Sequence, residues 1–262
     1  MQLIVTDLDR TLLHTDKSIS VHSCRVLNSL RSNGFKLVFA TARPPRSVRS
    51  FLEQIPCDAV ICHNGALTLV DGIPFGQQYR IPIHFVRKLL RHIQAAYPQQ
   101  KLSVEINDRL YANFDARTFW ENTEFVQTDF TTLPDSDAEK VIVEIADETQ
   151  YLEICGLLPP QLYGEISDGK LCLILNRNAT KYNALRWLCA AWKIPREDVC
   201  GFGDDYNDIE MLRWCGLGVA MANAIPQVRS AADIVTLSND EDGVAGFLER
   251  YLPEHGLYRE PV

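Results

Sequence analysis

Long apolar runs and an excess of positive charge are both missing from this sequence of 262 residues. A membrane-spanning helix needs about 20 consecutive apolar residues, and we find no run of that length. Lysine and arginine number 26 against 34 aspartates and glutamates, which gives a net charge of −8. Nucleic acids and anionic membranes bind basic surfaces, so neither is an expected partner. The chain opens on an apolar strand rather than on a basic leader with a cleavage site, and we expect a cytoplasmic protein.

Paired cysteine motifs are absent as well, although the chain has eight cysteines. Zinc sites and redox-active disulfides usually have two cysteines separated by two other residues, and no such pair occurs. Cys172 in "KLCLIL" and Cys189 in "RWLCAAW" lie within apolar stretches, as small core residues do. We therefore expect reduced thiols with a structural role.

What the sequence does contain is a regular alternation of strand and helix patterns at both ends of the chain. Apolar runs at 3–7, 36–40 and 58–62 predict strands, and residues 18–34 and 44–55 between them predict helices. After residue 178 the alternation returns, with helices expected at 180–192, 205–215, 224–232 and 243–252 and strands at 198–204, 216–221 and 233–236. Such alternation is typical of an α/β fold with a parallel sheet.

The middle of the chain has a different pattern. Alternating apolar residues predict hairpins over 66–81, around Asp71-Gly72, and over 101–114, around Asn107-Asp108. Helices are expected at 83–97 and 148–158, with strands at 139–146 and 170–175. We predict an inserted α+β domain at 78–178, and a doubly wound, mostly parallel Rossmann-like core formed by 1–77 and 179–262.

Polar residues gather where the predicted parallel strands end. They are "DLDRT" at 7–11, "TAR" at 41–43, "HNG" at 63–65 and "GDDYND" at 203–208. Ligands of open α/β sheets bind beyond the carboxyl ends of the strands. Each segment alone is more often a turn or a helix cap, but four of them at one edge indicate a site.

The chemistry of such a site follows from its charge. Several aspartates in one cleft would force some carboxylates to protonate, and a divalent cation removes that conflict. Oxygen ligands without histidine or cysteine favour a hard cation, and Mg²⁺ commonly binds one or two carboxylates together with a substrate phosphate. Thr41 and Lys181 offer a hydroxyl and an ammonium group to that phosphate.

Three of these segments, together with Lys181, resemble the four motifs of the haloacid dehalogenase superfamily of phosphatases: "DLDRTLL", "ATAR", Lys181 and "GDDYNDIEML". The position of the insertion, "HNGA" and "GVAMANA" are similar to the Cof-type branch with a large α/β cap (type IIB). The resemblance covers nearly the whole chain. It implies a hydrolase that acts on a small-molecule phosphate ester, with sugar phosphates expected first and nucleotide or vitamin phosphates next.

The resemblance also implies a role for each residue. Asp7 is the nucleophile that becomes an aspartyl phosphate, and Asp9 is the general acid and base. The side chains of Asp7 and Asp204 and the backbone carbonyl of Asp9 hold Mg²⁺. Thr41 and Lys181 bind the phosphate, and Asn207 is a phosphate ligand or a partner of Lys181. Asp208 lies behind the metal ligands or is an outer metal ligand itself.

Two positions depart from the family pattern, because Arg10 and Ala42 stand where glycine is commoner. A glycine there often marks a backbone with positive φ or a close approach. Arg10, Arg43 and Asn64 are candidate substrate contacts. Two other functions remain open: a sugar phosphomutase on the same fold, and a non-catalytic module that binds a phosphorylated ligand. Product analysis separates the first, and the intact catalytic set argues against the second.

Overall fold

The computed structural model describes residues 1–167 and 169–255, which form two compact units. The first unit contains Met1–Gln77 and the chain from Thr180 onward, and the second contains Gln78–Ala179. Each has a buried apolar core of its own. No helix in the described part of the chain is long and apolar enough to cross a membrane.

The first unit is built on an eight-stranded sheet with the order β14-β13-β12-β1-β2-β3-β4-β5. The six strands from β14 to β3 are parallel, and β4 and β5 continue the sheet antiparallel. The strands are β1 (Leu3–Thr6), β2 (Lys36–Ala40), β3 (Ala59–Cys62), β4 (Leu67–Val70), β5 (Ile73–Pro74), β12 (Val199–Gly203), β13 (Leu217–Ala220) and β14 (Ile234–Val235). The predicted α/β fold is confirmed.

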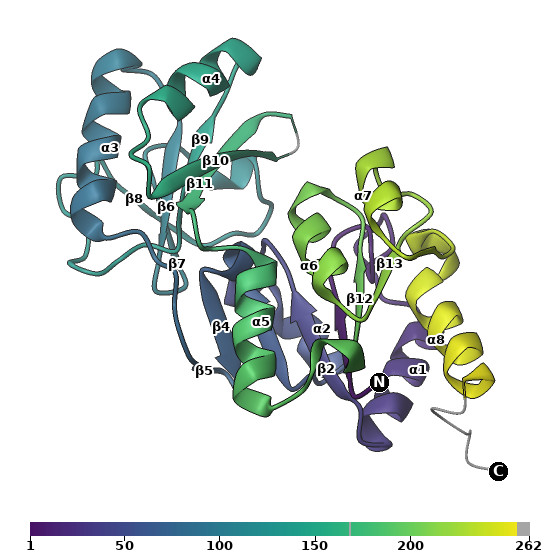
Figure 1. Cartoon of the computed structure of the whole chain (residues 1–262). Coiled ribbons are helices and arrows are strands. Elements are labelled where there is room, and N and C mark those ends of the chain that lie inside the picture. The colour runs from purple at the N-terminus through teal and green to yellow at the C-terminus, as the bar shows by residue number, and fades with distance from the viewer. Residues whose placement is uncertain (168, 256–262) are drawn as a thin grey trace. The chain divides into compact units, whose positions relative to one another are not determined.

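Helices cover both faces of this sheet, as right-handed crossovers require. Helix α1 packs beside α8, and α6 packs against both α5 and α7 (Figure 1). The helices are α1 (Val21–Ser32), α2 (Arg49–Gln54), α5 (Lys181–Trp192), α6 (Ile209–Trp214), α7 (Pro226–Ala231) and α8 (Gly243–Glu254). Short 3-10 turns are η1 (Pro45–Ser47), η2 (His63–Gly65), η4 (Arg196–Asp198), η5 (Tyr206–Asp208) and η6 (Asn239–Glu241). The helix predicted at 205–215 therefore begins as the 3-10 turn η5.

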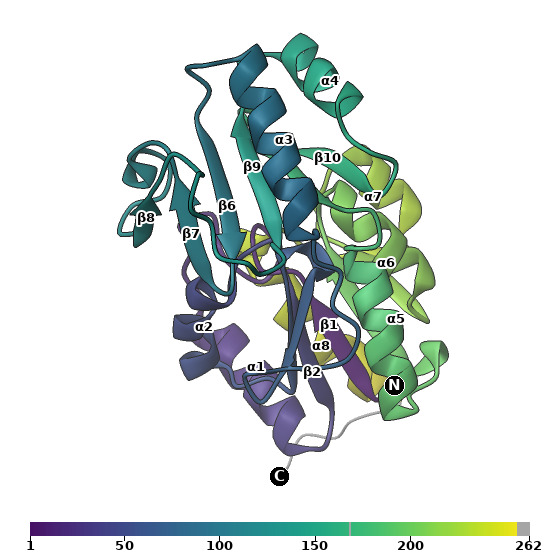
Figure 2. The same ribbon diagram turned by 90° about the vertical axis from the view of Figure 1, so that its left-hand side faces the viewer.

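The second unit is a six-stranded sheet with the order β10-β11-β9-β6-β7-β8, antiparallel except for the β7–β8 pair. Its strands are β6 (Leu102–Ile106), β7 (Arg109–Ala112), β8 (Phe125–Gln127), β9 (Lys140–Glu144), β10 (Leu162–Ser167) and β11 (Leu171–Asn176). Helices α3 (Ile83–Ala96) and α4 (Glu148–Gly156) pack on one face of it (Figure 2), and η3 spans Ala116–Thr118.

Strands β8 and β10 are absent from the sequence prediction. In β10 a glycine interrupts the apolar alternation, and glycine in a strand interior weakens the signal. The structure shows why glycine fits there: a β-carbon on Gly164 would lie 2.7 Å from the sulfur of Cys155 and 3.1 Å from that of Cys172. Pairing with β11 along the whole of its length forms the strand instead.

Candidate active site

A buried ion-pair network stands at the carboxyl ends of β1 and β12. Asp7 follows β1 directly, and Lys181 opens α5, where Thr180 caps the helix by accepting the backbone N–H of Asn183. The Lys181 ammonium group donates to Oδ1 of Asp7 at 2.8 Å and to Oδ1 of Asp208 at 2.7 Å. The lysine is only 1% exposed, so these two carboxylates balance a charge that water does not reach. Their proximity raises the pKa of Lys181 despite its burial.

Asp208 connects the Lys181 side chain to the backbone of the loop after β12. Its second oxygen accepts the backbone N–H groups of Asp204 at 3.0 Å and Asp205 at 3.2 Å. Asp208 thus ties the loop after β12 to Lys181. Asn207 forms no hydrogen bond with Lys181 in this structure: its Nδ2 donates to Oδ1 of Asn64 at 3.1 Å, and its own Oδ1 is buried without a hydrogen-bond partner among the described residues.

Three carboxylates, those of Asp7, Asp204 and Asp208, each place an oxygen within 4.8 Å of the others. Burial, followed by the charges of Asp208 and Asp204, acts to raise the pKa of Asp7 well above its usual value, while Lys181 opposes the shift. When ionised, the three acids and one ammonium group carry two excess negative charges, which one divalent cation would neutralise. The donors are all oxygens, so the set fits a hard cation such as Mg²⁺.

Asp204 is held in place by the first loop. The Thr11 hydroxyl donates to Oδ1 of Asp204 at 2.7 Å, which links the segment after β1 to the segment after β12. Burial raises the pKa of Asp204 to about 6, with a further contribution from Asp208. A cation that binds beside this carboxyl would therefore stabilise its ionised form.

Asp9 lies near this network but has different partners. Its two oxygens accept Nε and Nη2 of Arg43, both at 2.7 Å, and Oδ1 also accepts Nζ of Lys17 at 2.8 Å. Burial acts to raise the pKa of Asp9, but the hydrogen bonds from Arg43 and then from Lys17 lower it to about 2. Arg43, predicted as a substrate contact, thus binds a predicted catalytic acid. Sequence reasoning did not single out Lys17, because nothing in "HTDKS" indicates which way its side chain points.

The segments after β2 and β3 are joined by a backbone hydrogen bond. The Thr41 side chain accepts the Arg43 N–H at 3.1 Å, and the Thr41 carbonyl accepts the N–H of Asn64 at 3.0 Å. His63, Asn64 and Gly65 all have positive φ angles, of 49°, 55° and 107°. A left-handed turn of this kind brings Asn64 next to the loop that carries Asn207.

The two departures from the family pattern differ in structure. Arg10 has a φ of 59° and is exposed, so it adopts the left-handed conformation that glycine tolerates best. Its carbonyl accepts Nδ2 of Asn223 at 2.8 Å, which holds the strained residue in place. Ala42 is not among the residues of positive φ, so a side chain is accommodated there without this strain.

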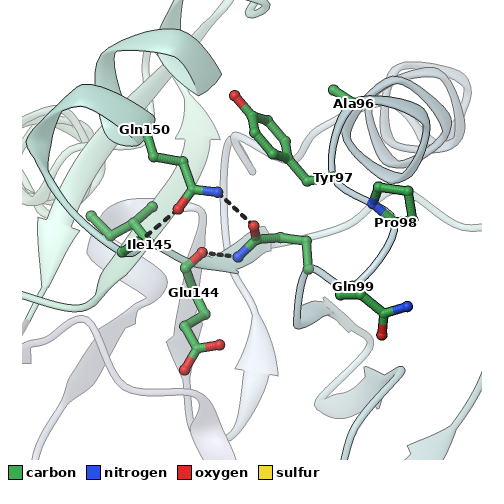
Figure 3. A pocket seen from close by; sticks show the side chains of 9 residues that line it. Ala96, Tyr97, Pro98, Gln99, Glu144, Ile145 and Gln150 are labelled. Atoms are coloured by element: carbon green, nitrogen blue, oxygen red, sulfur yellow. Dashed lines mark hydrogen bonds between the residues drawn. The ribbon is translucent and has the colours of Figure 1, made fainter.

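The second unit has a shallow pocket of about 600 Å³ between the end of α3 and the start of α4. The Gln150 amide donates to Oε1 of Gln100 at 2.6 Å and accepts the N–H of Ala146 at 2.7 Å, and Gln100 donates to the carbonyl of Glu144 (Figure 3). None of the predicted site residues line this pocket. The side-chain amides of Gln100 and Gln150 are paired with each other, which is typical of a structural network.

A doubly wound sheet whose carboxyl edge carries buried aspartates, a lysine and a threonine defines a class of enzyme that handles phosphate esters with a divalent cation. Comparison with known proteins agrees. The family model of the haloacid dehalogenase-like hydrolases matches residues 4–248, and the chain belongs to that family. It is a phosphatase, a phosphoric monoester hydrolase, of the Cof-type subclass IIB.

Two curated bacterial relatives match the chain over nearly its whole length. It is 30% identical over 264 residues to the 5-amino-6-(5-phospho-D-ribitylamino)uracil phosphatase YitU of Bacillus subtilis, covering 95% of this chain and 97% of YitU. It is 29% identical over 259 residues to a putative phosphatase of Haemophilus influenzae, covering 96% and 98%. The solved subclass IIB sugar phosphatase BT4131 superposes with a TM-score of 0.82, covering 98% of this chain and 100% of that one, at 21% identity, and shares the fold.

Proposed function

We propose that this phosphatase hydrolyses a small phosphorylated metabolite through an aspartyl phosphate on Asp7, with Mg²⁺ as cofactor. The observation that carries the proposal is the buried contact of 2.8 Å between Asp7 and Lys181, at the end of the strand that also leads to Asp9. A nucleophilic carboxylate needs a neighbouring cation to remain ionised in a buried site. Lys181 supplies one such charge.

The reaction we assign has two balanced steps. A carboxylate oxygen of Asp7 attacks phosphorus, the bond from phosphorus to the alcohol oxygen breaks, and the leaving oxygen takes a proton from Asp9. Asp9 must take up this proton as the ester binds, because its hydrogen bonds with Arg43 and Lys17 otherwise hold its pKa at about 2. Water then attacks the same phosphorus and gives a proton back to Asp9, while the bond to Asp7 breaks. One ester and one water become one alcohol and one inorganic phosphate, and the side chains return to their starting state.

Phosphate is held, in this account, by groups that stabilise charge on its oxygens. The Lys181 ammonium group has three hydrogens, two of which point to Asp7 and Asp208, and we assign the third to the phosphoryl group. Thr41 and Asn207 are the further phosphate ligands that we propose. Asp208, whose oxygens receive three protein donors, serves to position Lys181 and the Asp204 loop.

For Mg²⁺ we propose the carboxylates of Asp7 and Asp204 and the backbone carbonyl of Asp9 as ligands. When bound, the ion neutralises the charge of these acids and of the phosphate. The fit rests on the carboxylate oxygens of Asp7 and Asp204, which together with one of Asp208 lie within 4.8 Å of one another and form a set of oxygen donors only.

The substrate class that we propose is a phosphorylated sugar or a similar polyol, and nucleotide or vitamin phosphates come next. Support comes from relatives: YitU is named for a substrate with a phosphorylated ribityl chain, and BT4131 is titled a sugar phosphatase. We also propose that the second unit, residues 78–179, acts as the cap that selects the leaving group.

A panel of phosphorylated metabolites tests this function, with phosphate release measured as kcat/KM in the presence of Mg²⁺. We expect hydrolysis of several sugar phosphates, loss of activity with EDTA and loss of activity in Asp7→Asn with the fold intact by circular dichroism. Near-normal activity of Asp7→Asn would overturn the assignment. An isomerised sugar phosphate in place of free phosphate would favour the phosphomutase instead.

A further inference from the structure

Both oxygens of Asp9 are occupied, and the three donors come from two different segments. Arg43 follows β2, and Lys17 lies in the turn before α1. Oδ1 receives two of the donors, from Arg43 at 2.7 Å and from Lys17 at 2.8 Å. Oδ1 can carry the proton that a leaving-group oxygen takes only when at least one of these N–H donors turns away from it.

The two cations are held with unequal firmness. The Arg43 side chain is 22% exposed, contacts both oxygens of Asp9 and lies over the Phe51 ring at 5.1 Å. The Lys17 side chain is 55% exposed and makes a single contact with Asp9. A flexible, hydrated ammonium group exchanges partners at lower cost than a planar guanidinium bound through two nitrogens. Lys17 is thus the donor that yields first.

The turn that carries Lys17 is built to present it. Its φ of 69° lies in the left-handed region, where a non-glycine residue costs about 1 kcal/mol or more. The turn is fixed from outside, since Thr15 donates its N–H and its hydroxyl to Asp240, both at 2.7 Å. Asp16 accepts the N–H and the hydroxyl of Ser18 at 2.9 and 2.6 Å. A strained residue on an anchored turn is expected where its side chain has a task.

We propose that Lys17 is a positioning residue for Asp9: it holds Oδ1 while no leaving group is present and withdraws when one binds. Arg43 keeps the carboxyl plane in place throughout. The proposal rests on the proposed function, in which Asp9 gives its proton to the leaving oxygen. It assigns to Lys17 an effect that depends on how much the leaving group needs that proton.

Two aryl phosphates of nearly the same shape measure this dependence. Phenolate is a more basic leaving group than p-nitrophenolate and relies more on a proton from Asp9. In Lys17→Met no lysine occupies Oδ1, so Asp9 protonates the leaving group more readily, and phenyl phosphate gains more from this than p-nitrophenyl phosphate. We therefore expect the ratio of kcat/KM for phenyl phosphate to that for p-nitrophenyl phosphate to rise by about threefold or more. The parameter kcat/KM is used because it reports only the steps up to phosphoryl transfer to Asp7. Weaker attraction of the phosphate dianion affects both substrates equally and cancels in the ratio. Lys17→Arg should restore the wild-type ratio.

Lys36→Met is the matched control, because Lys36 forms a partly buried pair with Asp58 at 2.9 Å, at the start of β2 rather than at its carboxyl end. Its ratio should equal that of the wild type. Lys17→Gly is a second variant that relieves the positive φ, and it should give the same raised ratio as Lys17→Met. An unchanged or lowered ratio in Lys17→Met and Lys17→Gly, or an equal rise in Lys36→Met, would overturn the proposal. Wild-type protein that hydrolyses neither ester would instead contradict the proposed function.

Discussion

At the scale of single residues, Arg10 is the clearest departure from what the sequence alone suggests. Its φ of 59° places an arginine in a conformation that favours glycine. We expect Arg10→Gly to raise the free energy of unfolding by up to about 1 kcal/mol, since relief of strain exceeds the added entropy of the unfolded chain. Urea denaturation measures this change, and a loss of more than about 1 kcal/mol would show that the side chain itself stabilises the loop. A raised KM in the same variant would identify Arg10 as a substrate contact.

The raised pKa of Asp204 leads to a prediction of how Mg²⁺ affinity depends on pH. Its folded-state pKa is raised from 3.8 to about 6, so in metal-free protein the carboxyl is protonated below about pH 6 and the cation must displace that proton. We expect the contribution of Asp204 to the Mg²⁺ dissociation constant to be flat above about pH 7 and to rise about tenfold per pH unit well below 6. Protonation of Asp7, whose pKa is also raised, adds to this dependence.

Calorimetric titration with Mg²⁺ between pH 5 and 8 checks this, with Asp204→Asn as the comparison. That variant should bind Mg²⁺ weakly and lose the dependence that Asp204 causes. Wild-type affinity that does not change with pH would contradict a role for Asp204 as a ligand.

At the scale of elements, the left-handed turn η2 and the start of α5 depend on each other. A β-carbon on Gly65 would lie 2.3 Å from the carbonyl oxygen of Thr180, which caps the helix that Lys181 opens. We expect Gly65→Ala to reduce the free energy of unfolding by about 2 to 4 kcal/mol and to lower kcat, because Lys181 moves with its helix.

Gly34→Ala is the control for backbone strain alone. Gly34 also has a positive φ, of 89°, but a β-carbon there would meet no atom within 4 Å. We expect it to cost about 1 kcal/mol with kcat unchanged. If urea unfolding gave equal losses for the two variants, the close approach to Thr180 would not be the cause.

At the scale of the whole molecule, the chain carries one folding unit inserted within another. The two ends of the second unit lie together, since the Asn176 amide donates to the carbonyl of Arg80 at 3.0 Å. We expect residues 78–179, expressed alone, to unfold cooperatively with a midpoint that Mg²⁺ does not move. In the full chain, Mg²⁺ at 100 times its dissociation constant should stabilise the first unit by about 2.7 kcal/mol. A Mg²⁺-dependent midpoint of the isolated segment would contradict this division.

Most of the fold was predictable because its elements follow local apolar periods, from β1 to α8. The site was predictable only in part. The sequence places Asp7, Asp204 and Lys181 at the ends of elements, and parallel topology then indicates one edge. The pairing of Lys181 with Asp208, of Asp9 with Lys17 and of Asn64 with Asn207 depends on contacts between distant segments and on positive φ angles, neither of which leaves a local pattern.

The most direct test of the account is to trap the covalent intermediate. Borohydride reduces an aspartyl phosphate to homoserine, so the enzyme is quenched during turnover of p-nitrophenyl phosphate with Mg²⁺, reduced, digested and read by mass spectrometry. We expect homoserine at position 7, absent without substrate and absent in Asp7→Asn. Turnover without homoserine at position 7, or homoserine at another aspartate, would contradict the assignment of Asp7 as the nucleophile.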